Sequence, residues 1–266
     1  MKIGKRVFEL NKTFIMGILN ITPDSFYPKS RISEKEALTK AKEMIEHGVD
    51  IIDLGGESTR PGFESITAEE EINRILPILI ELKKHVDAPI SVDTYKAEVA
   101  EKAIIAGADF INDVWGLKKD PKMAEVIAKY GVTCCLMHNR SIAKYSNLVE
   151  DIISDLKESV CLALSAGIKK DKIILDPGIG FAKSYEDNLL VLKNLMRFKE
   201  LGFPLLLGAS RKSVIGLSLD LPIEERLSGT LATTVLAINA GFDFVRVHDV
   251  IENKRAAKMT DIICRS

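Results

Sequence analysis

Eight short apolar runs in this sequence each end in a side chain that could take part in chemistry. A strand that runs out into a loop often turns polar, but eight of eight such ends indicate a shared site. The residues are Asn20; Asp53; Asp93; Asn112 and Asp113; His138 and Asn139; Asp176; Ser210, Arg211 and Lys212; and Arg246, His248 and Asp249.

Two of these residues predict an anion site. Arg246 and His248 are two positions apart on one expected strand, so both side chains point to the same side. A pair of cations suits a phosphate or pyrophosphate group. The alternative is that Arg246 forms a salt bridge with Asp249 or Asp113.

The same residues bear on metal binding. Zinc is disfavoured because the strand ends offer only two histidines, far apart in the sequence. An amide oxygen such as that of Asn20 suits Mg²⁺, which shares its coordination sphere with phosphate oxygens and water. Ser210 is a poor candidate for a hydrolase nucleophile because the segment after it lacks the glycine of a nucleophile elbow.

The apolar runs predict strands that alternate with helices. Strand starts are about 33 residues apart, the length of one strand–helix unit. This repeat predicts a (β/α)₈ TIM barrel, in which all strand ends meet on one face, and a doubly wound open sheet is the alternative. The expected strands are 14–19, 51–54, 90–92, 110–111, 132–137, 173–175, 205–207 and 244–247.

Helix boundaries are marked between these strands. Ser33, Thr67 and Ser184 are each followed three positions later by an acidic residue, which predicts helix starts. Pro77 predicts a kink or a late start in the second helix. Six glycines stand where a helix would end before a strand, a position that favours left-handed backbone. They are Gly48, Gly107, Gly131, Gly167, Gly202 and Gly241.

Composition narrows the function classes. The 266 residues have 46% hydrophobic content and a formal charge of −1, so we expect one globular domain over residues 1–266 and no nucleic-acid partner. No apolar run is long enough to span a membrane, and no signal peptide is expected. Four cysteines without CxxC spacing indicate a reducing environment, hence a cytoplasmic protein.

Longer segments carry a family resemblance. The run from Met16 to Phe26, MGILNITPDSF, and the run from Asp53 to Gly62, DLGGESTRPG, resemble the two signatures of the dihydropteroate synthase family. Further matches follow in order, and the resemblance covers nearly the whole chain. They are SVDT from Ser91, IND from Ile111, LMH from Leu136, DPGIGF from Asp176, SRKS from Ser210 and RVHDV from Arg246.

The resemblance implies a cytoplasmic, homodimeric TIM-barrel transferase of folate biosynthesis. Such an enzyme joins 6-hydroxymethyl-7,8-dihydropterin pyrophosphate to 4-aminobenzoate, uses Mg²⁺ and is a target of sulfonamides. Asp93, Asn112 and Asp176 would then bind the pterin ring, beside Lys212 and the apolar Met137. Asn20 would bind Mg²⁺ with the pyrophosphate, which Arg246 and His248 would hold. Thr59, Arg60, Pro61, Phe181 and Ser213 would frame the aminobenzoate. The residues expected to act in catalysis are Asp93, Lys212, Arg246, Thr59 and Arg60.

The sequence departs from the family pattern in three places. The segment Tyr27–Ser30 replaces a glycine-rich continuation, Ala182 stands where a glycine is usual, and the residues after His138 differ. Two rival functions are a barrel methyltransferase that moves a methyl group from a folate to a corrinoid protein, and a pterin-binding scaffold without turnover. Neither rival would release pyrophosphate, whereas a synthase would.

Overall fold

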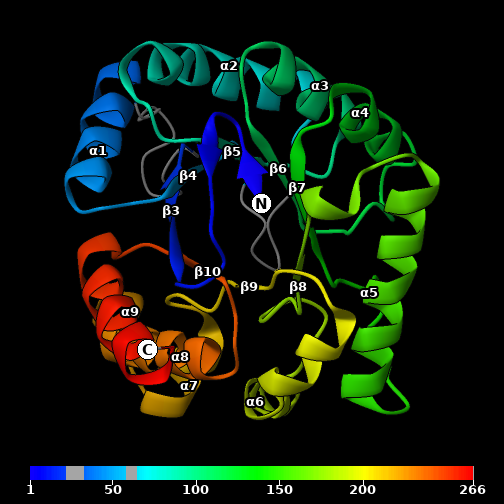
Figure 1. The fold of residues 1–266 in the computed structure, drawn as a ribbon, viewed down its shortest axis with the longest axis vertical. Coiled ribbons are helices and arrows are strands. Elements are labelled where there is room, and N and C mark those ends of the chain that lie inside the picture. Colours follow the sequence, from blue (N-terminus) through cyan, green and yellow to red (C-terminus); the bar gives the residue numbers. More distant parts are fainter. Residues whose placement is uncertain (22–32, 58–64, 266) are drawn as a thin grey trace.

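Eight parallel strands form the centre of the computed structural model, which describes residues 1–21, 33–57 and 65–265 (Figure 1). Their order is β8-β7-β6-β5-β4-β3-β10-β9, and a parallel bridge between Leu175 and Leu205 closes the sheet between β8 and β9. The predicted (β/α)₈ barrel is therefore confirmed. The strands are β3 (Phe14–Asn20), β4 (Ile51–Gly55), β5 (Ile90–Asp93), β6 (Phe110–Asp113), β7 (Thr133–Met137), β8 (Ile173–Asp176), β9 (Leu206–Leu207) and β10 (Phe244–Val247).

Helices surround the strands as an outer ring (Figure 1). No helix among the described residues is long and apolar enough to cross a membrane. The helices are α1 (Glu34–Glu46), α2 (Ala68–His85), α3 (Ala97–Ile105), α4 (Met123–Tyr130), α5 (Leu148–Ser165), α6 (Tyr185–Lys193), α7 (Ser213–Leu219), α8 (Leu227–Asn239) and α9 (Val250–Cys264). Short 3₁₀ segments are Lys170–Lys172, Leu195–Leu201 and Ile223–Glu225.

The local signals in the sequence explain most helix ends. Ser33 and Ser184 each form a full capping box, and the Thr67 side chain accepts from the backbone N–H of Glu70. All six predicted helix-ending glycines have positive φ, between 64° and 109°. The late start expected at Pro77 is wrong, because α2 begins at Ala68 and includes the proline.

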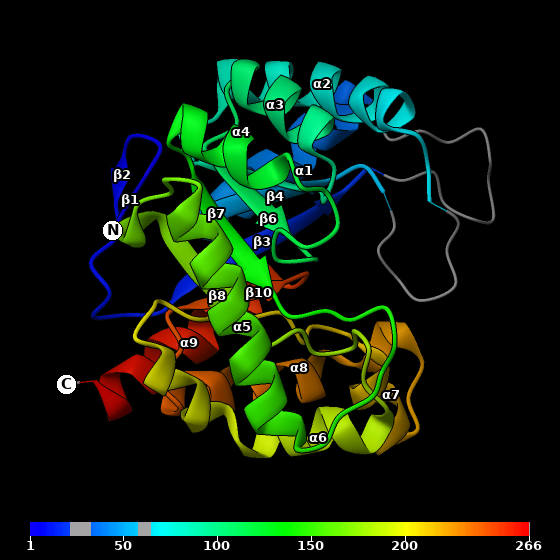
Figure 2. The same ribbon diagram turned by 90° about the vertical axis from the view of Figure 1, so that its right-hand side faces the viewer.

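A short amino-terminal hairpin, which the sequence analysis did not predict, covers one end of the barrel. Strands β1 (Lys2–Ile3) and β2 (Arg6–Val7) pair antiparallel at the end of the barrel seen on the left of Figure 2. Phe8, just after the hairpin, lies 4.8 Å from Phe14 and 6.1 Å from Phe244, measured between ring centroids. Together with buried Ile3, these rings form a dry floor inside the barrel.

On four strands, a polar side chain follows the apolar side chain of this floor, two residues nearer the carboxyl end of the strand. Ile51, Phe110, Ile174 and Phe244 belong to the inner apolar cluster. Side chains two positions further along a strand point to the same face. These are Asp53, Asn112, Asp176 and Arg246. The floor thus becomes a polar layer near the carboxyl ends of the strands.

The turn after β8 contains strained backbone at the position where the family usually has glycine. Ala182 has φ +46°, in the left-handed region that costs a residue with a Cβ about 1 kcal/mol. We therefore expect Ala182→Gly to raise the free energy of unfolding by up to about 1 kcal/mol, measured by urea titration.

The matched control is Ala128→Gly, inside α4, where left-handed backbone is not required. That change should lower stability by about 1 kcal/mol, because glycine is a poor helix former. If both variants lose the same stability, Ala182 is not strained in solution.

Candidate active site

The guanidinium of Arg246 joins two buried carboxylates at the centre of the polar layer. Its Nε donates to Asp53 Oδ2 at 2.6 Å and its Nη2 donates to Asp93 Oδ2 at 2.7 Å. The Asp53 side chain is fully buried and that of Asp93 is 6% exposed. Three strands, β4, β5 and β10, therefore meet through one cation.

This cluster of Arg246, Asp53 and Asp93 holds two carboxylates and one guanidinium. Burial, with the nearby Asp53 carboxylate adding to it, raises the pKa of Asp93 to about 7, although Arg246 opposes the shift. Burial alone would lower the pKa of Arg246, but Asp53 and Asp93 hold it above its ordinary value. Two carboxylates thus share one permanent cation, and a ligand with hydrogen-bond donors would relieve the excess negative charge.

Each carboxylate that Arg246 binds has one buried oxygen without a hydrogen-bond partner among the described residues. They are Asp53 Oδ1 and Asp93 Oδ1, the oxygens opposite those that Arg246 binds. An unpaired buried acceptor costs roughly 1–3 kcal/mol, so such atoms commonly await a ligand or water. The two oxygens are the strongest sign of a binding site for a molecule with N–H donors.

Acceptors from the neighbouring strands extend this surface. Asn112 is buried, and its amide lies 3.5 Å from Asp53 Oδ2. Asp176 is buried at the end of β8, where its Oδ1 accepts from the backbone N–H of Gly178 at 2.7 Å. Met137 is buried and pairs in register with Asp176, so it supplies an apolar neighbour. The structure therefore brings these predicted pterin residues to one end of the barrel with Asp93.

A lysine and an aromatic ring lie beside these acceptors. Lys212 Nζ donates to the carbonyl of Ile179 and lies 4.6 Å from the ring centroid of Phe181. Burial lowers the pKa of Lys212 to about 8, although Asp176 opposes the shift. Ser213 follows at the first position of α7 and is exposed. Phe181 thus comes from the loop after β8, Lys212 from the loop after β9, and Ser213 from the start of α7.

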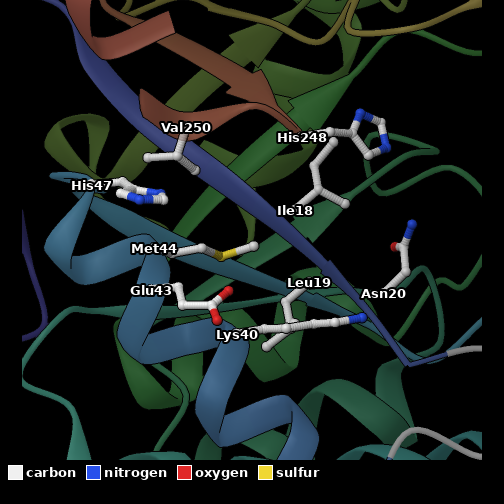
Figure 3. Close-up of a pocket in the computed structure, with 9 residues that line it drawn as sticks. All are labelled: Ile18, Leu19, Asn20, Lys40, Glu43, Met44, His47, His248 and Val250. Atoms are coloured by element: carbon white, nitrogen blue, oxygen red, sulfur yellow. The ribbon is translucent and has the colours of Figure 1, made fainter. Parts of the chain in front are cut away.

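A separate pocket of about 320 Å³ beside α1 is lined by two of the predicted residues, Asn20 and His248. Figure 3 shows Asn20 and His248 at one end of this pocket, and α1 along its other side. Its lining residues are Ile18, Leu19, Asn20, Lys40, Glu43, Met44, His47, His248 and Val250. Arg246 does not line the pocket, because its guanidinium is turned toward Asp53 and Asp93.

Ser210, dismissed as a nucleophile, contacts the imidazole of His248. Its Oγ lies 3.0 Å from His248 Nδ1 and accepts from the backbone N–H of His248 at 3.2 Å. Because the oxygen only accepts in that bond, the Ser210 hydroxyl proton is available to be donated to His248 Nδ1. This arrangement orients the His248 ring.

The alternative salt bridges considered for Arg246 are wrong. Asp249 is bound by both Nε and Nη2 of Arg211, at 2.9 and 2.6 Å. Asp113 accepts from the backbone N–H groups of Trp115 and Leu117, at 2.8 and 2.7 Å. Both carboxylates stabilise loops at the carboxyl ends of the strands, and neither reaches Arg246.

Asn20 is the residue predicted to bind Mg²⁺. Among residues 1–21, 33–57 and 65–265, no three His, Cys, Asp or Glu side chains form a metal-binding group. Asn20 is exposed at the end of β3 and shares a pocket with His248. A single amide oxygen is chemically suited to Mg²⁺, which takes its other ligands from phosphate and water.

Some predicted residues cannot be placed, and some placed residues were given no role from sequence. Thr59, Arg60, Pro61 and the segment Tyr27–Ser30 lie outside the described residues. Asp53 was expected only as a polar strand end, without a role of its own. Lys183 was not expected in the site, because a lysine in a polar turn resembles a surface residue.

Comparison with known proteins agrees with this geometry. The family model described as pterin binding enzyme matches residues 16–248. A dihydropteroate synthase from Clostridium beijerinckii is 60% identical over 268 residues and covers 100% of both chains.

Solved structures give the same result. One from Clostridium difficile, obtained in the presence of pteroic acid, has 51% identity, a TM-score of 0.94 and 100% coverage of both chains. A Yersinia pestis dihydropteroate synthase in complex with a sulfonamide drug has 36% identity and a TM-score of 0.95, covering 100% of this chain and 99% of its own. The chain therefore belongs to the pterin-binding enzymes and, among them, to the dihydropteroate synthases.

Proposed function

We propose that the polar layer of the barrel carries out the dihydropteroate synthase reaction with the residue roles below. The reaction joins 6-hydroxymethyl-7,8-dihydropterin pyrophosphate to 4-aminobenzoate and releases pyrophosphate. The observation that carries the assignment is the pair of unpartnered oxygens, Asp53 Oδ1 and Asp93 Oδ1, above an apolar floor. A pterin ring offers N–H donors for such acceptors and an aromatic face for apolar contact.

In this proposal the pterin ring binds deepest in the barrel. Asp93, Asn112 and Asp176 accept its N–H groups, and Lys212 donates to one of its acceptor atoms. Met137 packs against the ring. The pteroic acid named with the Clostridium difficile structure supports this assignment, because pteroic acid contains the same ring.

The pyrophosphate group lies toward Asn20 and His248. Arg246 stands between this end and the pterin carboxylates, and its Nη1 takes part in neither ion pair. That nitrogen can donate to a phosphate oxygen while the others hold Asp53 and Asp93. Mg²⁺ at Asn20 would neutralise charge on the phosphates, and His248, oriented by Ser210, would add a donor.

The chemical step replaces a carbon–oxygen bond with a carbon–nitrogen bond. The bond from the pterin methylene to pyrophosphate breaks, the amine of aminobenzoate bonds to that carbon, and the amine loses a proton. We favour a dissociative path, because the aromatic amine is a weak nucleophile and the pterin ring can stabilise a cation. The Asp93 carboxylate then stabilises positive charge at the methylene, and Arg246 stabilises the leaving pyrophosphate.

The aminobenzoate occupies the outer part of the site. Phe181 and Ser213 contribute from the loops after β8 and β9, and Thr59, Arg60 and Pro61 are proposed to complete the pocket. A sulfonamide shares the aniline ring of aminobenzoate and should compete for this position. The sulfonamide complex named for the Yersinia pestis relative supports this assignment.

A direct assay tests the proposal. The purified protein is supplied with both substrates and Mg²⁺, and release of pyrophosphate is followed together with formation of dihydropteroate. Stoichiometric formation of both products is expected. Pterin binding without pyrophosphate release would instead support a non-catalytic scaffold.

We also propose that the protein is a cytoplasmic homodimer. Neighbouring helices α7 and α8 expose large apolar side chains, such as Leu217 (66% exposed) and Leu236 (50% exposed). Such side chains on adjacent helices favour contact with a second copy. Sedimentation velocity should give twice the monomer mass, and Leu217→Glu with Leu236→Glu should shift the protein toward monomer.

The first prediction concerns Asp93→Asn. The variant should keep its fold, because Arg246 retains its ion pair with Asp53. It loses the charge that faces the developing cation, so kcat should fall on the order of 100- to 1000-fold. Steady-state kinetics beside a thermal unfolding curve measures this.

Asp87→Asn, at an exposed position, serves as the matched control and should leave kcat unchanged. Near-normal turnover in folded Asp93→Asn would remove Asp93 from the mechanism.

The second prediction concerns Arg246→Ala. Removing the guanidinium leaves two buried carboxylates without a cation, which should lower the free energy of unfolding by about 3 kcal/mol. Binding of the pyrophosphate-bearing substrate should weaken more than binding of free pterin, because the guanidinium pairs with phosphate as well as with Asp93. Calorimetry with both ligands measures the difference.

Adding Asp53→Asn to Arg246→Ala separates the two roles. The double variant should regain part of the stability but none of the pyrophosphate affinity. Equal weakening of both ligands in the double variant would mean that Arg246 is only structural.

The third prediction concerns pH. As the pH falls through about 7, Asp93 becomes protonated and loses its catalytic charge. As the pH rises through about 8, Lys212 loses its proton. The value of kcat/KM should therefore be greatest between these limits and fall on both sides.

Lys212→Arg should move the alkaline limb to higher pH, because arginine stays protonated, and should leave the acid limb in place. An alkaline limb that stays in place in this variant would show that another group causes it.

A further inference from the structure

A lysine ammonium lies inside the turn that follows β8. Lys183 Nζ donates to the carbonyls of Gly178 and Phe181, at 2.9 and 3.1 Å, and lies 2.9 Å from His138 Nδ1. These three partners match the three N–H bonds of an ammonium group. Burial lowers the pKa of Lys183 to about 7, although Asp176 opposes the shift. The lysine therefore joins both ends of this turn to the loop after β7.

The histidine in this contact is fixed from its other side. The His138 side chain is fully buried, and its Nε2 lies 3.0 Å from Asp155 Oδ2 on α5. Burial lowers the pKa of His138 to about 4, so the ring is neutral near pH 7. Since a carboxylate can only accept, Nε2 carries the proton and Nδ1 accepts from Lys183. Arg140 Nε also donates to Asp155, at 2.5 Å.

Backbone strain in this turn is confined to Ala182. Gly178 and Gly180 have φ of 73° and 81°, which glycine adopts without steric cost, whereas Ala182 has φ of 46°. A Cβ on Gly178 would lie 2.1 Å from the carbonyl oxygen of His138, so the turn packs directly on the loop after β7. Side-chain bonds offset the strain at Ala182 and hold the turn against that loop, and Lys183 makes three of them.

The same turn positions two residues of the proposed site. Its Ile179 carbonyl accepts from Lys212, and its Phe181 ring lies under the Lys212 ammonium. A shift of the turn would move both, whereas Asp93 and Asn112 lie on strands β5 and β6 and would stay in place.

We propose that Lys183, held by His138, is a positioning residue that fixes Phe181 for the aminobenzoate substrate. The proposal rests on the site role given above for Phe181. It assigns Lys183 no contact with substrate. Its loss should therefore act on aminobenzoate binding and turnover, and much less on binding of the pterin ring.

The test compares Lys183→Met with Lys193→Met, an exposed lysine on α6. Lys183→Met should raise the KM for aminobenzoate about 10- to 100-fold, the loss expected for charged hydrogen bonds. It should also weaken sulfonamide binding by a similar factor, while calorimetric affinity for free pterin changes by less than about 3-fold. Lys193→Met should resemble the wild type in all three measurements.

A double-variant cycle tests whether Lys183 and His138 act together. His138→Leu should raise the aminobenzoate KM as well, and the double variant should be no worse than the more severe single variant. Additive effects would mean that the two residues act separately. If Lys183→Met does not fold, Lys183→Gln, which keeps a donor, should fold and show a smaller rise in KM.

Two results would overturn the proposal. One is an unchanged KM for aminobenzoate in folded Lys183→Met, and the other is equal weakening of pterin and sulfonamide. The sulfonamide measurement needs no turnover. A wild-type protein that binds both ligands but releases no pyrophosphate would therefore contradict the proposed reaction and leave this test intact.

Discussion

The site depends on one buried cation that holds carboxylates from two different strands. Without Arg246, Asp53 and Asp93 would repel each other in a region from which water is largely excluded. The guanidinium suits this position because it stays charged and its planar fork can reach two carboxylates at once. The arrangement still leaves one oxygen on each carboxylate unpaired. These unpaired acceptors lower the stability of the fold without ligand, and they are already in place when a ligand binds.

The fold was predictable because its determinants are local. The spacing of apolar runs, the serine caps and the six helix-ending glycines each depend on a few neighbouring residues, and the structure confirms them. The amino-terminal hairpin was missed, since two-residue strands leave no periodic signal. The late helix start expected at Pro77 was wrong for a different reason. Helix propensity alone excludes an internal proline, but α2 contains one.

The site was predictable only in part. Alternation along parallel strands indicates that Asp93, Asn112, Asp176 and Arg246 face one interior, and the family resemblance supplies the ligand. The partners of Arg246 did not follow from the sequence, because Asp53 is 193 residues away and closer acidic residues were equally plausible. Lys183 was missed for the same reason. Its environment depends on His138, which reaches it from the loop after β7 and is itself held by Asp155 on α5.

The hairpin under the barrel has a consequence for the order of events. Because Ile3, Phe8 and the neighbouring rings fill one end of the barrel, a ligand reaches the polar layer from the carboxyl ends of the strands. The carboxylates proposed to bind the pterin ring belong to this layer, and exposed Ser213 begins α7 beyond β9. With the proposed roles, a molecule bound first at the outer position would block access to the inner one. The inner ligand would therefore enter before the outer one, and a product that spans both positions would leave intact.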